Sequence, residues 1–408
     1  MRTLLINWEQ RKLSSGLREY TDRVIVEDDK EYYQISVRNN FGGITLRGSK
    51  MGNKIGRKRQ AKINLTKYPQ TLIFTRQTIE QGGIGWVDKY CDGAIVTENM
   101  PTISLDTSVF SKYFLTNLFQ TRIFYKNAIL DNVEGGSAQI AIHESKFLSS
   151  TLLFPNLDEQ KKIGAFFKQL DDTIALQQRR LDLLKKLKQG YLQQMFPTKD
   201  EVIPQLRFNI FNGAWEQVKL SELVTKEKSY SLSRDVETEK ETETRYIHYG
   251  DIHTGIADKI TNKNQLPFIK EDSYESLLKG DLILADASED YQGIAKPAII
   301  LETSKYRIVA GLHTIVLRSS DKSDSLYLYY LLKTKSFKRH GYRMGTGMKV
   351  FGITANNVLA FKTLLPSKKE QYRISQLLKI MDRLLALQQS KIKQLQQLKQ
   401  AYLQKLFP

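Results

Sequence analysis

Two stretches of the chain carry the same alternation of apolar and polar positions. In residues 155–197, apolar side chains recur at spacings of four and three, and a glutamine and a lysine fill the two gaps. Residues 366–408 repeat this pattern 211 positions later, with the two polar positions in register. The first seam comprises Ile163, Phe167, Leu170, Ile174, Leu181 and Leu184, and the second comprises Ile374, Leu378, Leu385, Ile392 and Leu395. Heptad seams of this length predict two helices of about 40 residues, each roughly 60 Å long.

The two seams favour pairing with each other, although each helix could instead pack only on its own globular region. Polar residues in a seam lower stability but specify register and partner number. A parallel pair would require the chain to return along the full helix length between the two helices, whereas an antiparallel pair would not. We therefore expect an antiparallel coiled-coil spacer.

The remaining segments predict two α+β domains. Short apolar runs bounded by glycine and polar clusters, such as residues 71–74 and 281–284, are typical of strands. Each segment also has one helical stretch, at residues 114–119 and 327–332. The expected fold class is thus α+β, with two globular domains separated by the two long helices.

The two domains open and close with related motifs. A Trp-Glu-Gln motif begins at Trp8 and again at Trp215, and glycine loops occupy residues 135–140 and 345–350. Little else aligns, so two similar scaffolds are expected to present different surfaces. The predicted order is a domain over 1–154, a helix over 155–197, a domain over 198–365 and a helix over 366–408.

The charge of the chain indicates a polyanionic partner. Its 408 residues include 62 basic and 44 acidic side chains, and its pI is about 9.6. The excess is uneven, because residues 201–300 hold 12 basic and 18 acidic residues, whereas 47–62 and 333–349 hold no acidic residue. Both basic runs are threaded with or adjoin glycines, which let backbone amides approach phosphates. Nucleic acid is the first partner to test, the alternative being a solvated basic surface.

Candidate DNA contacts follow from these runs and from the glycine loops. Cations would position the phosphate backbone, and side chains that reach base edges would specify sequence. The candidates are Arg47, Lys50, Lys54, Arg57, Arg59, Arg76, Gln77, Ser137 and Gln139 in the first domain, and Lys338, Arg339, Arg343, Thr346 and Lys349 in the second.

Motifs for catalysis are missing from the sequence. There is no Asp/Asn-Pro-Pro-aromatic loop for amino methylation and no Gly-x-x-x-x-Gly-Lys-Ser/Thr loop for ATP. The single cysteine, Cys91, excludes an internal disulfide framework, and the spacing of His248 and His253 makes a metal site only a minor alternative. We expect a recognition module with no catalytic residue, metal or cofactor of its own.

No stretch has the roughly 18 consecutive apolar residues of a membrane helix, and the first residues lack a signal-peptide core. A cytoplasmic protein that does not bind membranes is the expectation.

The repeat resembles the specificity subunit of Type I restriction-modification systems. The resemblance rests on WEQRKL (8–13), WEQVKL (215–220), FPNLDEQKKIGAFFKQLDDTIALQQ (154–178) and LLPSKKEQYRISQLLKIMDRLLALQQ (364–389). GDLILADASEDYQGI (280–294), AGLHTIVLR (310–318) and GTGMKVFGI (345–353) look like the target-recognition pattern of that family. The lead-in Leu206-Arg207-Phe208 before Trp215 has no counterpart before Trp8.

The resemblance implies a function in bacterial defence. Each recognition domain would read one half of a bipartite site in double-stranded DNA, and the coiled coil would set the gap and dock two modification subunits. Those subunits would methylate adenine, and restriction subunits would join them, so S-adenosylmethionine, Mg and ATP are expected on partner subunits only. Two alternatives stay open: a scaffold or silent allele that reads no DNA, and a self-contained DNA methyltransferase or nuclease.

Overall fold

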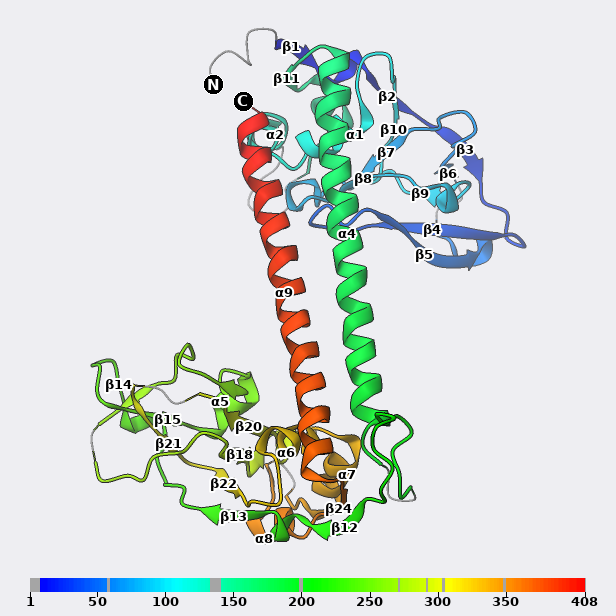
Figure 1. The fold of residues 1–408 in the computed structure, drawn as a ribbon. Coiled ribbons are helices and arrows are strands. Elements are labelled where there is room, and N and C mark those ends of the chain that lie inside the picture. The colour runs from blue at the N-terminus through cyan, green and yellow to red at the C-terminus, as the bar shows by residue number, and fades with distance from the viewer. Residues whose placement is uncertain are drawn as a thin grey trace. The chain divides into compact units, whose positions relative to one another are not determined.

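The computed structural model describes residues 8–56, 59–132, 141–197, 201–270, 272–290, 293–302, 305–347 and 350–407. The chain divides into two compact units, and each takes one part of both long helices. The first unit comprises Met1–Arg179 and Ser390–Pro408, and the second comprises Arg180–Gln389. Each globular domain is therefore packed with segments of two helices that are far apart in the sequence (Figure 1).

The described part of the first unit contains two larger sheets, a two-stranded pair and three short helices beside its segments of the long helices. One sheet has the order β2-β10-β7-β8, formed by Leu17–Tyr20, Thr102–Leu105, Thr71–Phe74 and Ile84–Trp86. The other has the order β3-β6-β9-β4-β5, formed by Asp22–Ile25, Arg59–Lys62, Ile95–Val96, Glu31–Val37 and Ile44–Met51. The short helices are α1 (Lys112–Leu118), α2 (Arg122–Phe124) and α3 (Glu144–Ser149).

The second unit has a sheet of order β13-β22-β18-β20-β16, formed by Val224–Glu227, Thr314–Ser319, Leu282–Ala285, Pro297–Ile300 and Lys259–Ile260. Its other sheet has the order β14-β17-β15-β21, formed by Glu237–Thr238, Phe268–Ile269, Thr244–Ile247 and Arg307–Ala310. A short pair joins β19 (Ala287–Ser288) to β23 (Phe351–Gly352). Its short helices are α5 (Tyr249–Thr254), α6 (Ser325–Leu331), α7 (Lys335–Met344) and α8 (Ala355–Leu359).

The two units share one scaffold. The sheet β2-β10-β7-β8 corresponds strand for strand to β13-β22-β18-β20, and every neighbouring pair is antiparallel. In both units the strand that carries the Trp-Glu-Gln motif pairs with the strand that precedes the long helix. These pairs are β1 (Glu9–Lys12) with β11 (Thr151–Phe154) and β12 (Glu216–Lys219) with β24 (Lys362–Leu365). The predicted similarity of the two scaffolds is thus seen at the level of strand order.

The long helices are α4 (Leu157–Gln194) and α9 (Lys368–Leu406). Every seam position that the sequence singles out is buried or half-buried. In the first unit the start of α4 lies beside the end of α9, because the rings of Phe167 and Phe407 have centroids 6.1 Å apart. In the second unit Met195 and Phe196, just beyond α4, share a core with Ile374 and Leu378 near the start of α9. Both units therefore contain antiparallel helix segments.

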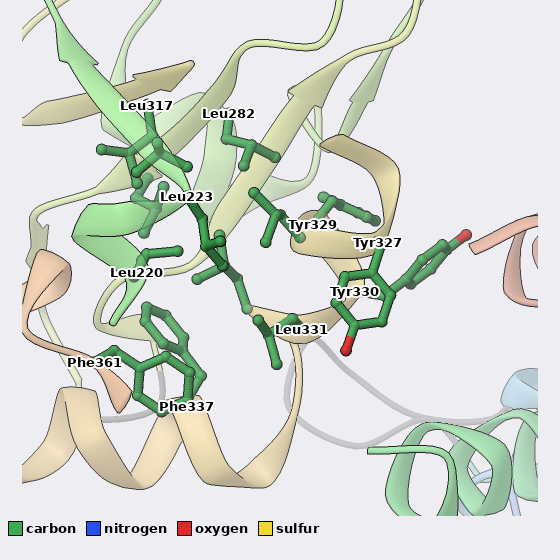
Figure 2. Packing of buried hydrophobic residues seen from close by; sticks show 14 of the residues in the cluster. Leu220, Leu223, Leu282, Leu317, Tyr327, Tyr329, Tyr330, Leu331, Phe337 and Phe361 are labelled. Atoms are coloured by element: carbon green, nitrogen blue, oxygen red, sulfur yellow. The ribbon is translucent and has the colours of Figure 1, made fainter. Parts of the chain in front are cut away.

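Each unit has its own large apolar core. That of the second unit is rich in leucine and tyrosine, and Figure 2 shows Tyr327, Tyr329 and Tyr330 of α6 in the same cluster as Leu282 and Leu317 of the sheet. The first unit places Leu403 and Phe407 of α9 in one cluster with Phe114 and Phe154. The last turns of α9 are thus part of the core of the first domain.

Candidate nucleic-acid interface

In the second unit, residues 345–347 and 350–352 form the two arms of what we call the glycine hairpin. Thr346 and Gly352 exchange two backbone hydrogen bonds, of 3.0 and 2.8 Å. Gly347 has a φ of +131°, and a Cβ there would come within 1.9 Å of the Val350 carbonyl oxygen. Only glycine fits this close approach to Val350. The side chain of Thr346 is exposed at the base of the hairpin.

Helix α7 presents cations next to this hairpin. Thr334 caps its start by accepting a hydrogen bond from the Phe337 amide, and Phe337 and Gly341 are buried. A Cβ on Gly341 would meet Ile294 at 3.1 Å, so α7 packs closely on the loop after β19. The predicted contacts Lys338, Arg339 and Arg343 lie on the exposed face of the helix. Their exposure suits phosphate contact, which stays a prediction.

Lys333, in the same basic run, has a structural role instead. Its Nζ lies 2.6 Å from Oδ1 of Asp258, and it also bonds the Tyr329 hydroxyl. Burial lowers the pKa of Lys333, and the charge of Asp258 opposes that shift. Basic residues in one run of the sequence thus divide between core and surface.

In the first unit, three of the predicted cations lie on or just after strand β5 of the β4–β5 hairpin. Arg47 and Lys50 are on β5, Lys54 follows it, and all three side chains are exposed. Gly52 is required by packing, because a Cβ there would come within 1.8 Å of the Glu27 carbonyl oxygen. This end of the sheet also carries Glu31, which accepts a hydrogen bond from Ser49 on β5.

The structure places Arg76 in an ion pair. Its Nη2 lies 2.6 Å from Oε2 of Glu144, the first residue of α3, and both side chains are about one-fifth exposed. Gln77, the next residue, is exposed. Arg57, Ser137, Gln139 and Lys349 lie outside the described residues, and of Arg59 only the backbone, in β6, is described. DNA contact by these residues stays a prediction.

One polar pair was not among the sequence-predicted contacts. Asp286 follows β18, and its Oδ1 lies 3.0 Å from Nδ1 of His313, whose φ is +56°. The ring of Tyr249 stands edge-on to His313, with centroids 5.3 Å apart. The only sequence signal was that these residues fall in the family-like segments 280–294 and 310–318.

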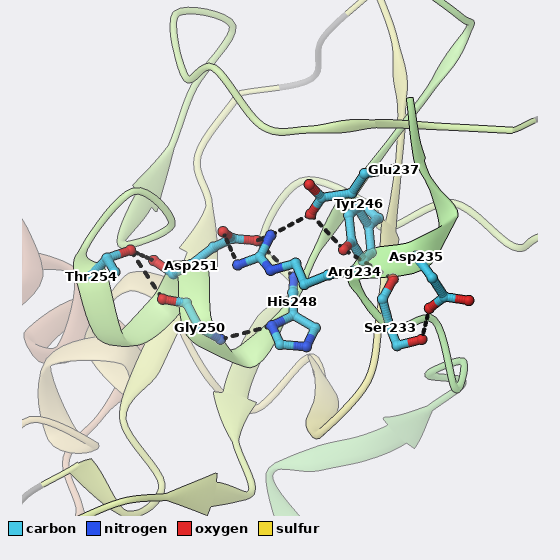
Figure 3. A network of polar contacts seen from close by, with 9 residues as sticks. All are labelled: Ser233, Arg234, Asp235, Glu237, Tyr246, His248, Gly250, Asp251 and Thr254. Carbon is cyan, nitrogen blue, oxygen red and sulfur yellow. Dashed lines mark hydrogen bonds and ion pairs between the residues drawn. The ribbon is translucent and has the colours of Figure 1, made fainter. Parts of the chain in front are cut away.

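A polar network surrounds the start of α5 (Figure 3). Arg234 bonds Asp251 at 2.7 Å and Glu237 at 2.5 Å. Burial acts to lower the pKa of Arg234, but these two carboxylates outweigh it and raise the pKa. Burial and the charge of Arg234 lower the pKa of His248, which favours the neutral ring whose Nδ1 accepts a hydrogen bond from an α5 amide. The network therefore serves structure and shows no nucleophile paired with a base.

Neither metal ligation nor membrane insertion has a visible basis in the described parts of the chain. No three His, Cys, Asp or Glu side chains gather there in an arrangement that could hold a metal ion. Among the same residues, no helix combines the length and the apolar character needed to cross a bilayer.

The duplicated scaffold with its two long helices can now be compared with known proteins. A family model described as the Type I restriction modification DNA specificity domain matches residues 13–186 and 212–397. The chain belongs to this family. The two matches coincide with the two copies of the repeat, so the family resemblance inferred from the motifs is confirmed.

Individual relatives agree with this assignment. The Type I restriction enzyme MjaVIII specificity subunit of Methanocaldococcus jannaschii is 23% identical over 291 residues, which cover 67% of this chain and 65% of that protein. Among solved structures, the HsdS subunit from Thermoanaerobacter tengcongensis has a TM-score of 0.53 at 17% identity, covering 98% of this chain and 97% of that one. The S subunit of a Type-I restriction-modification system from M. genitalium has a TM-score of 0.56 at 14% identity, covering 99% and 96%.

A third structure comes from work on complex assembly and conformational transition of the type I R-M system. Its TM-score is 0.59 at 17% identity, and the match covers 98% of this chain and 97% of that one. These likenesses concern the fold, and they confirm the predicted α+β class with two long helices.

Proposed function

We propose that this chain is the DNA-specificity subunit of a Type I restriction-modification enzyme, and that each unit reads one half of a bipartite site. The observation that carries the proposal is a scaffold present twice with different surfaces. The same four-stranded sheet underlies both units, yet cations lie on the β4–β5 hairpin in one and on α7 in the other. A two-headed reader of split sites needs a common frame and divergent contact residues.

The chain would itself be non-catalytic. The sequence lacks the motifs for amino methylation and for ATP binding, and the polar networks described above are structural. Adenine methylation would require a modification subunit that supplies S-adenosylmethionine. Cleavage would require restriction subunits that supply Mg and ATP.

The long helices offer a surface for partner subunits. In the second unit α9 exposes Ile380, Leu384 and Leu387, which follow the four-and-three spacing on a face different from the seam. On α4 the same unit exposes Leu183 and Leu187. Apolar stripes of this kind are typical of helix-docking surfaces. We infer that helices of modification subunits pack here.

Docking on these stripes can be tested by co-purification. The double substitution Ile380→Glu and Leu384→Glu should abolish capture of the modification subunit, because it places two charges in the apolar contact. Ala386→Glu, on another face of α9, should leave capture unchanged. Equal capture by the unsubstituted chain, the double variant and Ala386→Glu would contradict the assignment of this surface.

The proposed function is tested by expressing the chain with and without a modification subunit and mapping methylated adenines in the host DNA. A split motif is expected only with both proteins. Exchange of the two recognition domains should exchange the half-sites. An unsplit motif, or methylation by this chain alone, would contradict the proposal. A silent scaffold would bind the modification subunit but give no motif and no salt-sensitive gel shift.

A further inference from the structure

Both units hold the same backbone junction within two residues of the end of a buried strand. In the second unit the Asp286 amide donates to the His313 carbonyl at 3.0 Å, and the Asp286 carbonyl accepts from the Ile353 amide at 2.8 Å. These bonds tie the end of β18 to the start of β22 and to the end of the glycine hairpin.

The first unit repeats this junction residue by residue. The Arg76 amide donates to the Asn99 carbonyl at 3.0 Å, and the Arg76 carbonyl accepts from the Ile142 amide at 3.0 Å. Strand register gives the same correspondence, because Thr102 opposes Ile73 on β7 just as Val316 opposes Ile283 on β18. Arg76 therefore matches Asp286, and Asn99 matches His313.

The side chains at this shared junction differ in charge and in partner. Arg76 pairs with Glu144 of α3, whereas Asp286 pairs with His313. The position that corresponds to Glu144 is Ala355, the first residue of α8, so the second unit has no acid there. A constant backbone with exchanged polar side chains is what two readers of different sequences require.

The junction of the second unit exposes its polar side chains to a binding partner instead of burying them in the core. His313 is about half exposed, yet it adopts a left-handed φ of +56°, which is uncommon for a residue other than glycine. Asp286 and the edge of Tyr249 hold the imidazole in this position. Ala287 and Ser288, the next two residues, pair with Gly352 and Phe351, so the junction adjoins the glycine hairpin.

We propose that Asp286 and His313 read a base in the half-site bound by the second unit, an inference that rests on the proposed function. A carboxylate repels phosphate, so its place beside the hairpin suits a base edge instead. Next to a carboxylate, Nδ1 of His313 is the ring nitrogen that donates to Oδ1 of Asp286, 3.0 Å away. In the neutral ring, Nε2 is then an acceptor, as is Oδ2 of Asp286. Two acceptors match the amino groups of cytosine or adenine and are mismatched to the acceptor edges of guanine and thymine.

The test uses the full chain assembled with its modification subunit, after methylation mapping has defined both half-sites. Competition binding at fixed salt would compare duplexes that each carry one changed base pair. Asp286→Asn should lose discrimination at one cytosine or adenine position of one half-site by about 10- to 100-fold. Discrimination in the other half-site should stay at the wild-type level.

Two further variants keep the outcome interpretable. His313→Asn places the first unit's residue at the junction and tolerates a left-handed backbone, so it should relax the same position without unfolding the domain. Glu241→Gln removes an equal charge from an exposed ion pair with Lys305 and should not alter base preference. Wild-type discrimination in both Asp286→Asn and His313→Asn would overturn the inference. Failure of the wild-type complex to select any split site would instead overturn the proposed function, and this inference with it.

Discussion

Lys399 on α9 lies 2.7 Å from Asp171 on α4, and this ion pair fills a polar gap in the apolar seam. The second unit has an equivalent pair, in which Lys188 on α4 pairs with Asp382 on α9. Lys399 lies 211 positions after Lys188, and Asp382 lies 211 positions after Asp171. The lysine that interrupts each seam thus meets an aspartate of the other helix. Because both partners are repeated, the antiparallel arrangement forms the same pair twice.

The two pairs should differ in strength. Asp171 is 42% exposed, whereas Asp382 is 15% exposed and also bonds Lys259 at 2.7 Å and the Tyr330 hydroxyl at 2.6 Å. Loss of a surface pair costs about 0–1 kcal/mol. Loss of one partner of a buried network costs about 3–5 kcal/mol. We expect Asp382→Asn to lower the free energy of unfolding several times more than Asp171→Asn in urea titrations. Equal decreases in the two variants would contradict the expected difference between the two ion pairs.

The stability of the second unit should fall in acid. Burial acts to raise the pKa of Asp382, but hydrogen bonds from Lys188, Lys259 and Tyr330 outweigh it and hold the pKa below its ordinary value of 3.8. A depressed carboxylate pKa contributes stability that is fully present above the unfolded-state value and is lost as pH falls through the folded-state value. Unfolding free energy should therefore decrease below about pH 4. Asp382→Asn should show a shallower decrease, and an unchanged slope would exclude this residue as a cause.

A buried glutamine joins each long helix to its domain. The Oε1 of Gln371 accepts from the Asp324 amide at 2.9 Å, and its Nε2 donates to the Pro366 carbonyl at 2.9 Å. In the first unit Gln160 makes the same contacts with Ser111 and Pro155. Each glutamine thus satisfies the backbone just before α6 or α1 and just before its own long helix.

Substitution of either glutamine should destabilise its unit. Gln371→Met and Gln160→Met keep the volume but leave buried backbone groups without partners, at a cost of about 1–3 kcal/mol each. Hydrogen exchange should speed up at the first turn of α6 or α1, respectively. Gln397→Met, at an exposed position of α9, is the matched control and should change neither measurement.

The long helices could be predicted because their signal is local. A seam such as Ile374, Leu378 and Leu385 needs only the spacing along one helix, and the repeat exposes it twice. The polar residues that interrupt each seam could also be identified from the sequence, but their ion-pair partners could not. Lys399 and Asp171 are 228 residues apart and meet only in one register of the two helices.

The contact surfaces were harder to predict for the same reason. Lys333 and Lys338 look alike in the sequence, yet the first is half-buried beside Asp258 and the second is exposed. The match between Arg76 and Asp286 follows from strand register and backbone hydrogen bonds. It could not be predicted from residue composition. Sequence therefore indicated which segments matter and not which side chains emerge from them.

Insertion of one heptad into both α4 and α9, at matching points of the seam, should change the gap between half-sites and not the bases read. Seven residues lengthen a helix by about 10 Å and keep the apolar stripe in phase. That length corresponds to up to about three base-pair steps. Methylation mapping should find the same two half-sites with a wider gap.

Insertion of seven residues into the loop that follows α4 is the control and should leave the gap unchanged. If the heptad insertion altered base identity at an unchanged gap, the helices would not act as the ruler between the half-sites.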